Sequence, residues 1–309
     1  MSATAGVAAT GHEKAREWAQ RLDTVGVWSF DLDRMTATAA REFARAVESL
    51  GFRAIWLPEG LGSKEIFAHA GMLLAATNQL VIASGIANMW ARDAVAMANG
   101  ARALVDAYPD RFLLGIGVSH APTVKIRGET YRRPFEHMRE YLDAMDAAPY
   151  AGPKVEAPRV LAALGPRMLR LSAERALGAH PYFVPVEHTT QARKALGDGP
   201  LLAVEQAAVL SGDAGTARTA ARRHMKRYLD LDNYTNNLRR LGWTDADLAN
   251  GGSDKLVDAI VAWGEAGAVQ ERIADHRKRG ADHVCVQVLR TDLTAPATRE
   301  LEAIAKVAL

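Results

Sequence analysis

The chain carries almost none of the residue patterns on which metal, disulfide or nucleophilic chemistry depends. A single cysteine, Cys285, rules out an intramolecular disulfide, and its place in the apolar run at residues 283–289 predicts a buried thiol. The nine histidines form no His-Glu-x-x-His pair and no cluster with cysteine, which argues against a zinc site. A Gly-x-Ser-x-Gly elbow and a Walker loop are absent as well.

Charge and hydropathy argue against two further classes of protein. Lysine and arginine number 38 against 36 aspartates and glutamates, so the net charge is +2. The densest basic run, residues 222–227, is typical of one solvated helix face rather than of a nucleic-acid-binding surface. No apolar run approaches the roughly 18 residues of a membrane span, and residues 1–11 resemble no signal peptide. We therefore expect a cytoplasmic protein with neither nucleic acid nor membrane as a partner.

Short apolar runs alternate with helical patterns almost to the end of the chain. Eight runs predict buried parallel strands, at residues 24–30, 54–58, 80–87, 111–117, 159–163, 178–184, 201–210 and 283–289. This alternation fits either an open doubly wound sheet or a closed barrel. Gly115 and Gly117 are not followed by the third glycine of a dinucleotide-binding fingerprint. The strand number and this absence favour the α/β class and a (β/α)8 TIM barrel.

Two long segments depart from a minimal barrel, and we expect them to be insertions after strands 4 and 7. The first, residues 119–158, follows the fourth strand; the second, residues 214–267, contains helical patterns at residues 218–229, 233–241 and 256–263. Loops of this length usually cover the C-terminal face of a barrel, where its active site is built. We expect residues 1–23 to form an N-terminal segment with a lead-in helix and residues 24–309 to form one barrel domain.

Glycines recur where the predicted strands end. Gly85, Gly117, Gly165 and Gly178 each lie at or near such an end. Without a Cβ, a glycine lets a planar ring or a phosphate approach the backbone. Gly165 also precedes a helix that begins at Pro166, and free N–H groups at a helix start favour a phosphate. This pattern predicts an enzyme that takes its chemistry from an organic cofactor.

The strand-end motifs resemble those of the luciferase-like monooxygenase superfamily. The resemblance rests on the string Ser84-Gly85-Ile86-Ala87-Asn88, the pair Arg92-Asp93, and the stretches at residues 111–117 and 178–182. Within that superfamily the chain is most similar to the actinobacterial F420-dependent oxidoreductases. The resemblance implies the deazaflavin F420 as cofactor, a small organic substrate and a homodimer formed through helices around strands 2 and 3. It also implies a non-prolyl cis peptide between Gly85 and Ile86.

The same resemblance implies a set of cofactor-binding residues. Ile86 would support the central ring and Asn88 would bind its polar edge. The ribityl chain and the reacting face would lie against Gly117, Val118, Ser119 and His120. The phosphate would receive backbone donors from Gly165, Gly178 and Ala179. Ser84, Gly85 and His180 complete the expected set.

Two residues are candidates for catalysis, each with an alternative role. His120 could transfer a proton, because imidazole titrates near neutral pH, or it could only donate a hydrogen bond to the cofactor. Glu59 could be a general acid or base, or it could pair with an arginine as a structural charge. His180 could lie close to the cofactor or could be a packed side chain. Trp28, Trp56 and Trp90 could form the wall of a substrate pocket or could belong to the core.

The sequence alone does not determine the substrate or the cofactor. The sugar-phosphate dehydrogenase of the superfamily carries a histidine and a glutamate where this chain has Gly60 and His120. The predicted loop after the fourth strand carries four basic residues: Lys125, Arg127, Arg132 and Arg133. They could form a basic rim that binds the oligoglutamate tail of F420, or they could belong to a solvated loop. One alternative function is an FMN-dependent monooxygenase that needs a reductase partner. Another is a non-catalytic flavin-binding paralogue.

Overall fold

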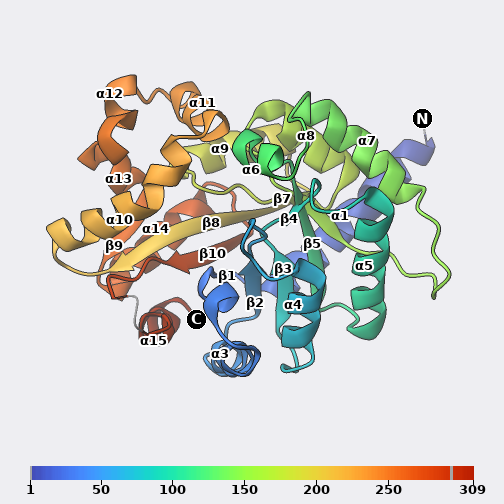
Figure 1. The fold of residues 1–309 in the computed structure, drawn as a ribbon, viewed down its shortest axis with the longest axis horizontal. Coiled ribbons are helices and arrows are strands. Elements are labelled where there is room, and N and C mark those ends of the chain that lie inside the picture. Colours follow the sequence, from blue (N-terminus) through green and yellow to red (C-terminus); the bar gives the residue numbers. More distant parts are fainter. Residues whose placement is uncertain (1, 293–294) are drawn as a thin grey trace.

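Eight parallel strands close into a barrel in the computed structural model, which describes residues 2–292 and 295–309 (Figure 1). Their order is β10–β1–β2–β3–β5–β6–β7–β8, and β8 pairs back with β10. All eight predicted strands and the predicted (β/α)8 class are therefore confirmed. The barrel strands are β1 (Val25–Trp28), β2 (Ala54–Leu57), β3 (Val81–Ser84), β5 (Phe112–Gly117), β6 (Arg159–Leu161), β7 (Gly178–Ala179), β8 (Leu201–Leu210) and β10 (His283–Val288).

The strands are mostly apolar because both of their faces are buried. In β8, Leu202 and Val204 pack against the helical layer, whereas Leu201 and Ala203 point into the barrel interior. Parallel sheets covered on both faces favour this apolar composition. The covering helices include α3 (Ala37–Ser49), α4 (Ile66–Leu74), α5 (Ala94–Ala107), α7 (Pro134–Asp146), α8 (Pro166–Arg175), α9 (Val186–Leu196), α14 (Ala266–Lys278) and α15 (Thr298–Ala308).

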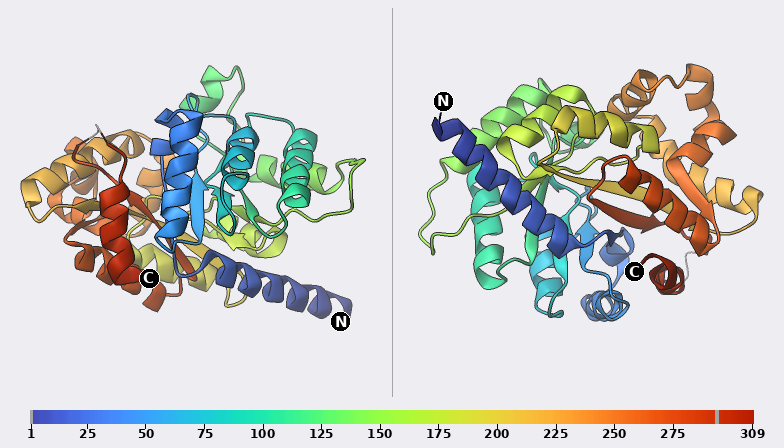
Figure 2. Two further views of the ribbon diagram at one scale, coloured as in Figure 1. Left: turned by 90° about the horizontal axis from the view of Figure 1, so that it is seen from below. Right: turned by 180° about the vertical axis from the view of Figure 1, so that it is seen from behind.

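The N-terminal helix α1 (Ser2–Leu22) runs across one end of the barrel (Figure 2). Trp18 and Leu22 belong to the same buried cluster as Trp56 and Leu113 from the barrel strands. This helix therefore closes the end opposite to the C-terminal ends of the strands. None of the helices that the structure describes is long and apolar enough to cross a membrane.

A cis peptide joins Gly85 to Ile86, as the resemblance implied, and it separates β3 from the short strand β4 (Ala87–Asn88). Beside it, the Ser84 hydroxyl bonds the backbone N–H and C=O of Gly115, both at 2.8 Å. A Cβ on Gly115 would lie 2.0 Å from the Ser84 carbonyl oxygen, so only glycine allows this approach. The end of β3 is thereby fixed against β5.

The two insertions lie where the sequence predicts them. Residues 118–158 contain α6 (Ala121–Ile126) and α7. The second insertion appears in yellow and orange at one side of the barrel (Figure 1). It contains α10 (Ala214–Leu229), α11 (Asp232–Arg240), α12 (Asp245–Leu248), a short 3-10 helix (Ala249–Gly251), α13 (Asp254–Ile260) and β9 (Val261–Gly264). A last short helix, α2 (Asp31–Arg34), follows β1.

One predicted helix was wrong in its second half. The expected helix at residues 256–263 ends at Ile260, and Val261–Gly264 form β9 instead. The cause is the length of β8, which extends past its pairing with β7 at Leu201 and Leu202. Its last four residues, 207–210, would otherwise leave one edge unpaired, and β9 pairs with them in parallel.

Candidate active site

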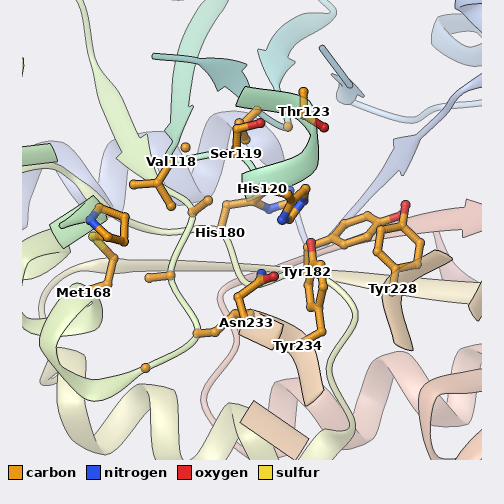
Figure 3. Close-up of a pocket in the computed structure, with 18 of the residues that line it drawn as sticks. Val118, Ser119, His120, Thr123, Met168, His180, Tyr182, Tyr228, Asn233 and Tyr234 are labelled. Atoms are coloured by element: carbon orange, nitrogen blue, oxygen red, sulfur yellow. The ribbon is translucent and has the colours of Figure 1, made fainter. Parts of the chain in front are cut away.

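A cavity of about 640 Å³ opens at the C-terminal ends of the barrel strands (Figure 3). Its floor comes from the ends of β1, β2, β3, β5, β6 and β7, and its walls come from both insertions. This is the face on which barrel enzymes build their active sites. Figure 3 shows His120, Asn233 and three tyrosines gathered on one side of the cavity, with Val118 and Met168 on the other side.

Most of the predicted site residues line this cavity. They are Glu59, Gly85, Ile86, Gly117, Val118, Ser119, His120, Gly165 and His180. Trp28 also lines it, whereas Trp56 is buried in the core, where it stacks on His180 with ring centroids 4.3 Å apart. Trp90 lies outside the lining and donates to the Val118 carbonyl at 2.9 Å. The chain thus brings residues from six strand ends to one place.

The other predicted residues lie beside the cavity rather than in its lining. Asn88 is buried, and its amide donates to the Ser119 hydroxyl at 3.1 Å, which ties the cis-peptide segment to the loop after β5. Gly178 and Ala179 are buried in β7. A Cβ on Gly178 would lie 1.8 Å from the Leu201 carbonyl oxygen, so close strand packing alone explains this glycine. Ser84 bonds Gly115, as described above.

Glu59 forms an ion pair with a partly buried arginine. Its side chain is 5 % exposed and forms a two-pronged ion pair with Arg92, which is 12 % exposed. The backbone N–H of Asn88 donates to the same carboxylate at 2.7 Å. Although burial lowers the pKa of Arg92, the hydrogen bond and the charge of Glu59 outweigh that effect and raise it. Arg92 is therefore the arginine with which Glu59 pairs. A catalytic role for Glu59 stays a prediction.

His120 has an uncharged imidazole ring at neutral pH and lines the cavity. Burial lowers its pKa, and the nearby Arg227 adds to this, whereas Asn233 raises the pKa by hydrogen bonding to the ring. Its Nδ1 is buried without a hydrogen-bond partner in the part of the chain that the structure describes. The ring centroid lies 5.4 Å from that of Tyr234. A neutral imidazole in this position can accept a proton, and this role for His120 stays a prediction.

Two unpaired polar atoms flank Gly85 on the cavity floor. His180 is bonded through Nδ1 to the Ala203 carbonyl at 2.9 Å, so Nδ1 carries the proton and Nε2 is a free acceptor. Burial lowers the pKa of His180 to about 4, which keeps this ring neutral. Trp28 Nε1 is likewise buried and has no partner among the described residues. A Cβ on Gly85 would lie 2.6 Å from Trp28 Nε1 and 3.0 Å from His180 Nε2, so the three residues form a polar cradle that only glycine leaves open.

The opposite end of the cavity is suited to an anion. Gly165, Pro166, Arg167 and Met168 all line it, and they form the first turn of α8 and the residue before it. The N–H groups of a first helical turn lack helical partners and carry a partial positive charge. The Arg240 guanidinium lies 3.5 Å from where a Gly165 Cβ would be. A phosphate group fits this end better than a carbonyl or an apolar group does.

A basic groove continues from that end of the cavity. It has a volume of about 310 Å³ and shares Phe135 and Arg167 with the cavity. Its other lining residues are Arg139, Arg170, Leu171, Glu174 and Arg175. Arg175 is committed to Asp143 and Asp146, and Arg167 pairs with Glu136 at 3.0 Å. The basic residues singled out in the sequence, Lys125, Arg127, Arg132 and Arg133, are absent from the lining of both the cavity and the groove.

Sequence reasoning missed the residues that the second insertion contributes. These are Arg227, Tyr228, Asn233, Tyr234, Asn236 and Arg240. The length of the insertion signals that it covers the barrel face, but helical periodicity does not tell which helix face meets the cavity. Tyr182 was part of the quoted strand motif, and it lines the cavity as well.

Glu205 in β8 is a buried carboxyl whose ionisation should weaken the fold. Its Oε2 accepts from the Phe183 N–H at 3.0 Å, and burial raises its pKa to about 8. Between the unfolded pKa of 4.5 and about pH 8 the folded state retains a proton that the unfolded state has lost, so this group makes stability fall as pH rises. We expect Glu205→Gln to gain stability over the wild type by about 1.4 kcal/mol per pH unit across this window. Urea unfolding at several pH values measures the difference.

The exposed Glu17 provides the control for this titration. Glu17→Gln should track the wild type at every pH, because the substitution changes an exposed side chain and leaves the buried Glu205 in place. A Glu205→Gln difference that does not change with pH would contradict the buried-proton interpretation.

Comparisons with known proteins agree with this fold. The family model described as luciferase-like monooxygenase matches residues 6–283. The curated 5,10-methylenetetrahydromethanopterin reductase of Methanolobus tindarius is 23% identical over an alignment of 207 residues, which covers 58% of this chain and 64% of that protein. The match thus spans less than two thirds of that relative.

Three solved structures show the same fold at low identity. An F420-dependent secondary alcohol dehydrogenase in complex with an F420-acetone adduct has a TM-score of 0.75 at 16% identity. The coenzyme F420 dependent tetrahydromethanopterin reductase from Methanopyrus kandleri has a TM-score of 0.67 at 15%. The oxygenating constituent of 3,6-diketocamphane monooxygenase from Pseudomonas putida, in complex with FMN, has a TM-score of 0.65 at 16%. Each comparison covers 92% of this chain and 97% of the other.

Proposed function

We propose that this chain, which belongs to the luciferase-like monooxygenase family, is an oxidoreductase that uses F420 to transfer a hydride to or from a small organic substrate. The observation that carries the proposal is the basic groove that continues from the end of the cavity suited to an anion. F420 and FMN share the ring system and the first phosphate, but F420 extends beyond that phosphate into an acidic oligoglutamate tail. Only the longer cofactor would use the groove.

The residues around the cavity fit such a cofactor. The unpaired Trp28 Nε1 and His180 Nε2 beside Gly85 offer one donor and one acceptor to the polar edge of a planar ring. The first turn of α8 and Arg240 would hold the phosphate. Arg139 and Arg170 would meet the carboxylates of the tail. When bound, F420 supplies two-electron hydride chemistry at C5, which needs no metal.

The chain itself would orient the substrate and exclude water. Trp28 and Phe30, at the C-terminal end of β1, form an edge-to-face pair with ring centroids 4.6 Å apart. Both side chains line the cavity. His120, which is neutral at pH 7, would serve as a proton acceptor in the cavity. Glu59 would keep Arg92 and the cis-peptide segment in place rather than react.

The nearest alternative is an FMN-dependent monooxygenase with a reductase partner. It is supported by the FMN-bound diketocamphane monooxygenase that shares the fold. A non-catalytic flavin-binding paralogue is the second alternative. The polar cradle at Gly85 is compatible with both alternatives, because a bound flavin would satisfy its unpaired atoms with or without turnover. Tight cofactor binding without turnover on any acceptor would support the paralogue. We also propose a homodimer, as the resemblance implies, which light scattering would test.

Parallel fluorescence titrations of the purified chain with oxidised F420 and with FMN test the cofactor. Micromolar or tighter binding of F420 together with much weaker binding of FMN is the expected result. The reverse preference would assign the chain to the FMN-dependent monooxygenases. Failure to bind either cofactor would overturn the proposal altogether.

The groove predicts a salt-dependent contribution to F420 binding. Replacing Arg139 and Arg170 by glutamine should weaken F420 binding roughly 3- to 10-fold at low salt, because partly exposed ion pairs each contribute modestly. The salt dependence of binding should fall in the same variant, and FMN binding should not change. Titrations at low and high salt measure both effects.

The matched control replaces Arg132 and Arg133, two exposed arginines outside both linings. We expect this variant to bind F420 as the wild type does. Loss of affinity in the control with none in the groove variant would place the acidic tail at the loop after β5 instead.

A further inference from the structure

Three tyrosines from different parts of the chain meet at the side of the cavity formed by the second insertion (Figure 3). Tyr182 follows β7, Tyr228 comes from α10 and Tyr234 from α11. The ring centroids of Tyr182 and Tyr228 lie 5.3 Å apart, and those of Tyr228 and Tyr234 lie 5.2 Å apart. All three line the cavity, which therefore has an aromatic wall on this side.

Tyr182 is the central member of a hydrogen-bonded chain. Its hydroxyl donates to Gln287 Oε1 at 2.8 Å and lies 2.8 Å from the Tyr228 hydroxyl. Since Tyr182 has one proton and gives it to Gln287, Tyr228 is the donor in the second bond. The acceptor that Tyr182 binds is an amide carbonyl oxygen from β10, and a substrate carbonyl is the same kind of acceptor. Binding a substrate carbonyl would require the hydroxyl to turn away from Gln287 Oε1.

Tyr182 also lies next to the polar cradle. Its ring centroid is 5.1 Å from that of Trp28, whose Nε1 flanks Gly85. Burial raises the pKa of Tyr182 well above 10 and that of Tyr228 to about 12, so both present O–H groups throughout the physiological range. Glu59 is the one carboxylate in the described lining of the cavity, and Arg92 already holds it. His120 is neutral and is a base rather than an acid.

We propose that Tyr182, supported by Tyr228 and Gln287, binds the oxygen of the substrate and exchanges its proton as hydride moves at the attached carbon. This inference rests on the proposed function and adds a substrate class, namely an uncharged ketone or secondary alcohol with an apolar or aromatic body. The aromatic wall of Trp28, Phe30 and Tyr228 suits such a body. Tyr182 is the catalytic residue in this scheme, and Tyr228 and Gln287 are positioning residues.

The step balances for ketone reduction. The carbonyl carbon receives the hydride, the π pair of the C=O bond moves to oxygen, and that oxygen takes the Tyr182 proton. An alkoxide is a far stronger base than a phenolate, so the proton transfer is favourable. Solvent returns one proton to Tyr182, and the reduced deazaflavin releases one proton as it is oxidised. In sum, the ketone and reduced F420 become the alcohol and F420.

Isotope-edited infrared spectroscopy of carbonyl-labelled acetophenone, bound to the full chain without cofactor, tests the hydrogen bond directly. On the wild type we expect the C=O band below its position in hexane, because the Tyr182 hydroxyl polarises the bond. In Tyr182→Phe the band of the bound probe should return toward the hexane position, and Tyr228→Phe should give an intermediate shift. Tyr108→Phe, at the C-terminal end of α5 and outside the cavity lining, should match the wild type.

A band that is the same in the wild type and in Tyr182→Phe would overturn the inference, and so would failure of acetophenone to bind the wild type. With F420 present, Tyr182→Phe should reduce kcat by about 10² or more and leave F420 affinity within twofold. An unchanged kcat would contradict the proton role. Since the infrared measurement needs no cofactor, a wild-type shift combined with absent F420 binding would refute the proposed cofactor alone.

Discussion

Replacing Arg92 by methionine should lower the free energy of unfolding by about 3–5 kcal/mol, since it leaves the Glu59 carboxylate buried without its partner. Methionine keeps much of the length of the side chain but provides no donor. Glu59 would then retain only the Asn88 N–H at 2.7 Å. Urea unfolding followed by circular dichroism measures the loss, and it should be accompanied by weaker cofactor binding because the segment after Gly85 is no longer fixed.

An exposed ion pair provides the control for this substitution. Arg239 pairs with Asp245 at 2.8 Å, with side chains 47% and 84% exposed. Arg239→Met should change stability by less than about 1 kcal/mol, because solvent screens such pairs. If Arg92→Met were as mild as Arg239→Met, the buried pair would not anchor this side of the site.

Replacing Gly115 by alanine should destabilise the fold by at least about 3 kcal/mol, because the new methyl group would overlap backbone rather than a flexible side chain. The added Cβ would lie 2.0 Å from the Ser84 carbonyl oxygen, and Ser84 also bonds both backbone groups of Gly115. Strands β3 and β5 would have to separate at the cis-peptide segment. Thermal and urea unfolding measure the effect.

Gly267→Ala is the matched control, since it lies in α14 and a Cβ there would meet nothing within 4 Å. We expect it to be neutral or to stabilise by about 0.5 kcal/mol through the higher helix propensity of alanine. Equal behaviour of the two variants would show that the close approach at Gly115 is not required for folding.

The barrel could be predicted from the sequence because the parallel strands are buried on both faces and are therefore rich in apolar residues. The strand β9 was not, because Val261–Gly264 directly follow helix α13 and pair only with the extended end of β8. That pairing depends on how far β8 extends beyond the barrel, and the local sequence pattern does not predict this length. A four-residue apolar run is equally suited to a helix or a strand.

The floor of the site was predictable for a related reason. Gly85, Gly117 and His180 follow strand ends, and the carboxyl ends of parallel strands in a barrel meet on one face. Gly178 also lies at a strand end, but there the glycine allows close packing against the Leu201 backbone and does not line the cavity. Tyr228 and Arg240 belong to helices whose orientation depends on tertiary packing, so their place in the cavity could not be inferred.

F420-dependent and FMN-bound proteins share this fold, so turnover separates the two cofactors best. The decisive measurement follows the F420 absorbance band after the wild-type chain is mixed with F420 and a panel of secondary alcohols, in air and without a reductase. We predict loss of the band at a rate proportional to enzyme concentration and insensitive to oxygen. No change in F420, together with oxygen consumption when reduced FMN is supplied, would contradict the proposal and identify a monooxygenase.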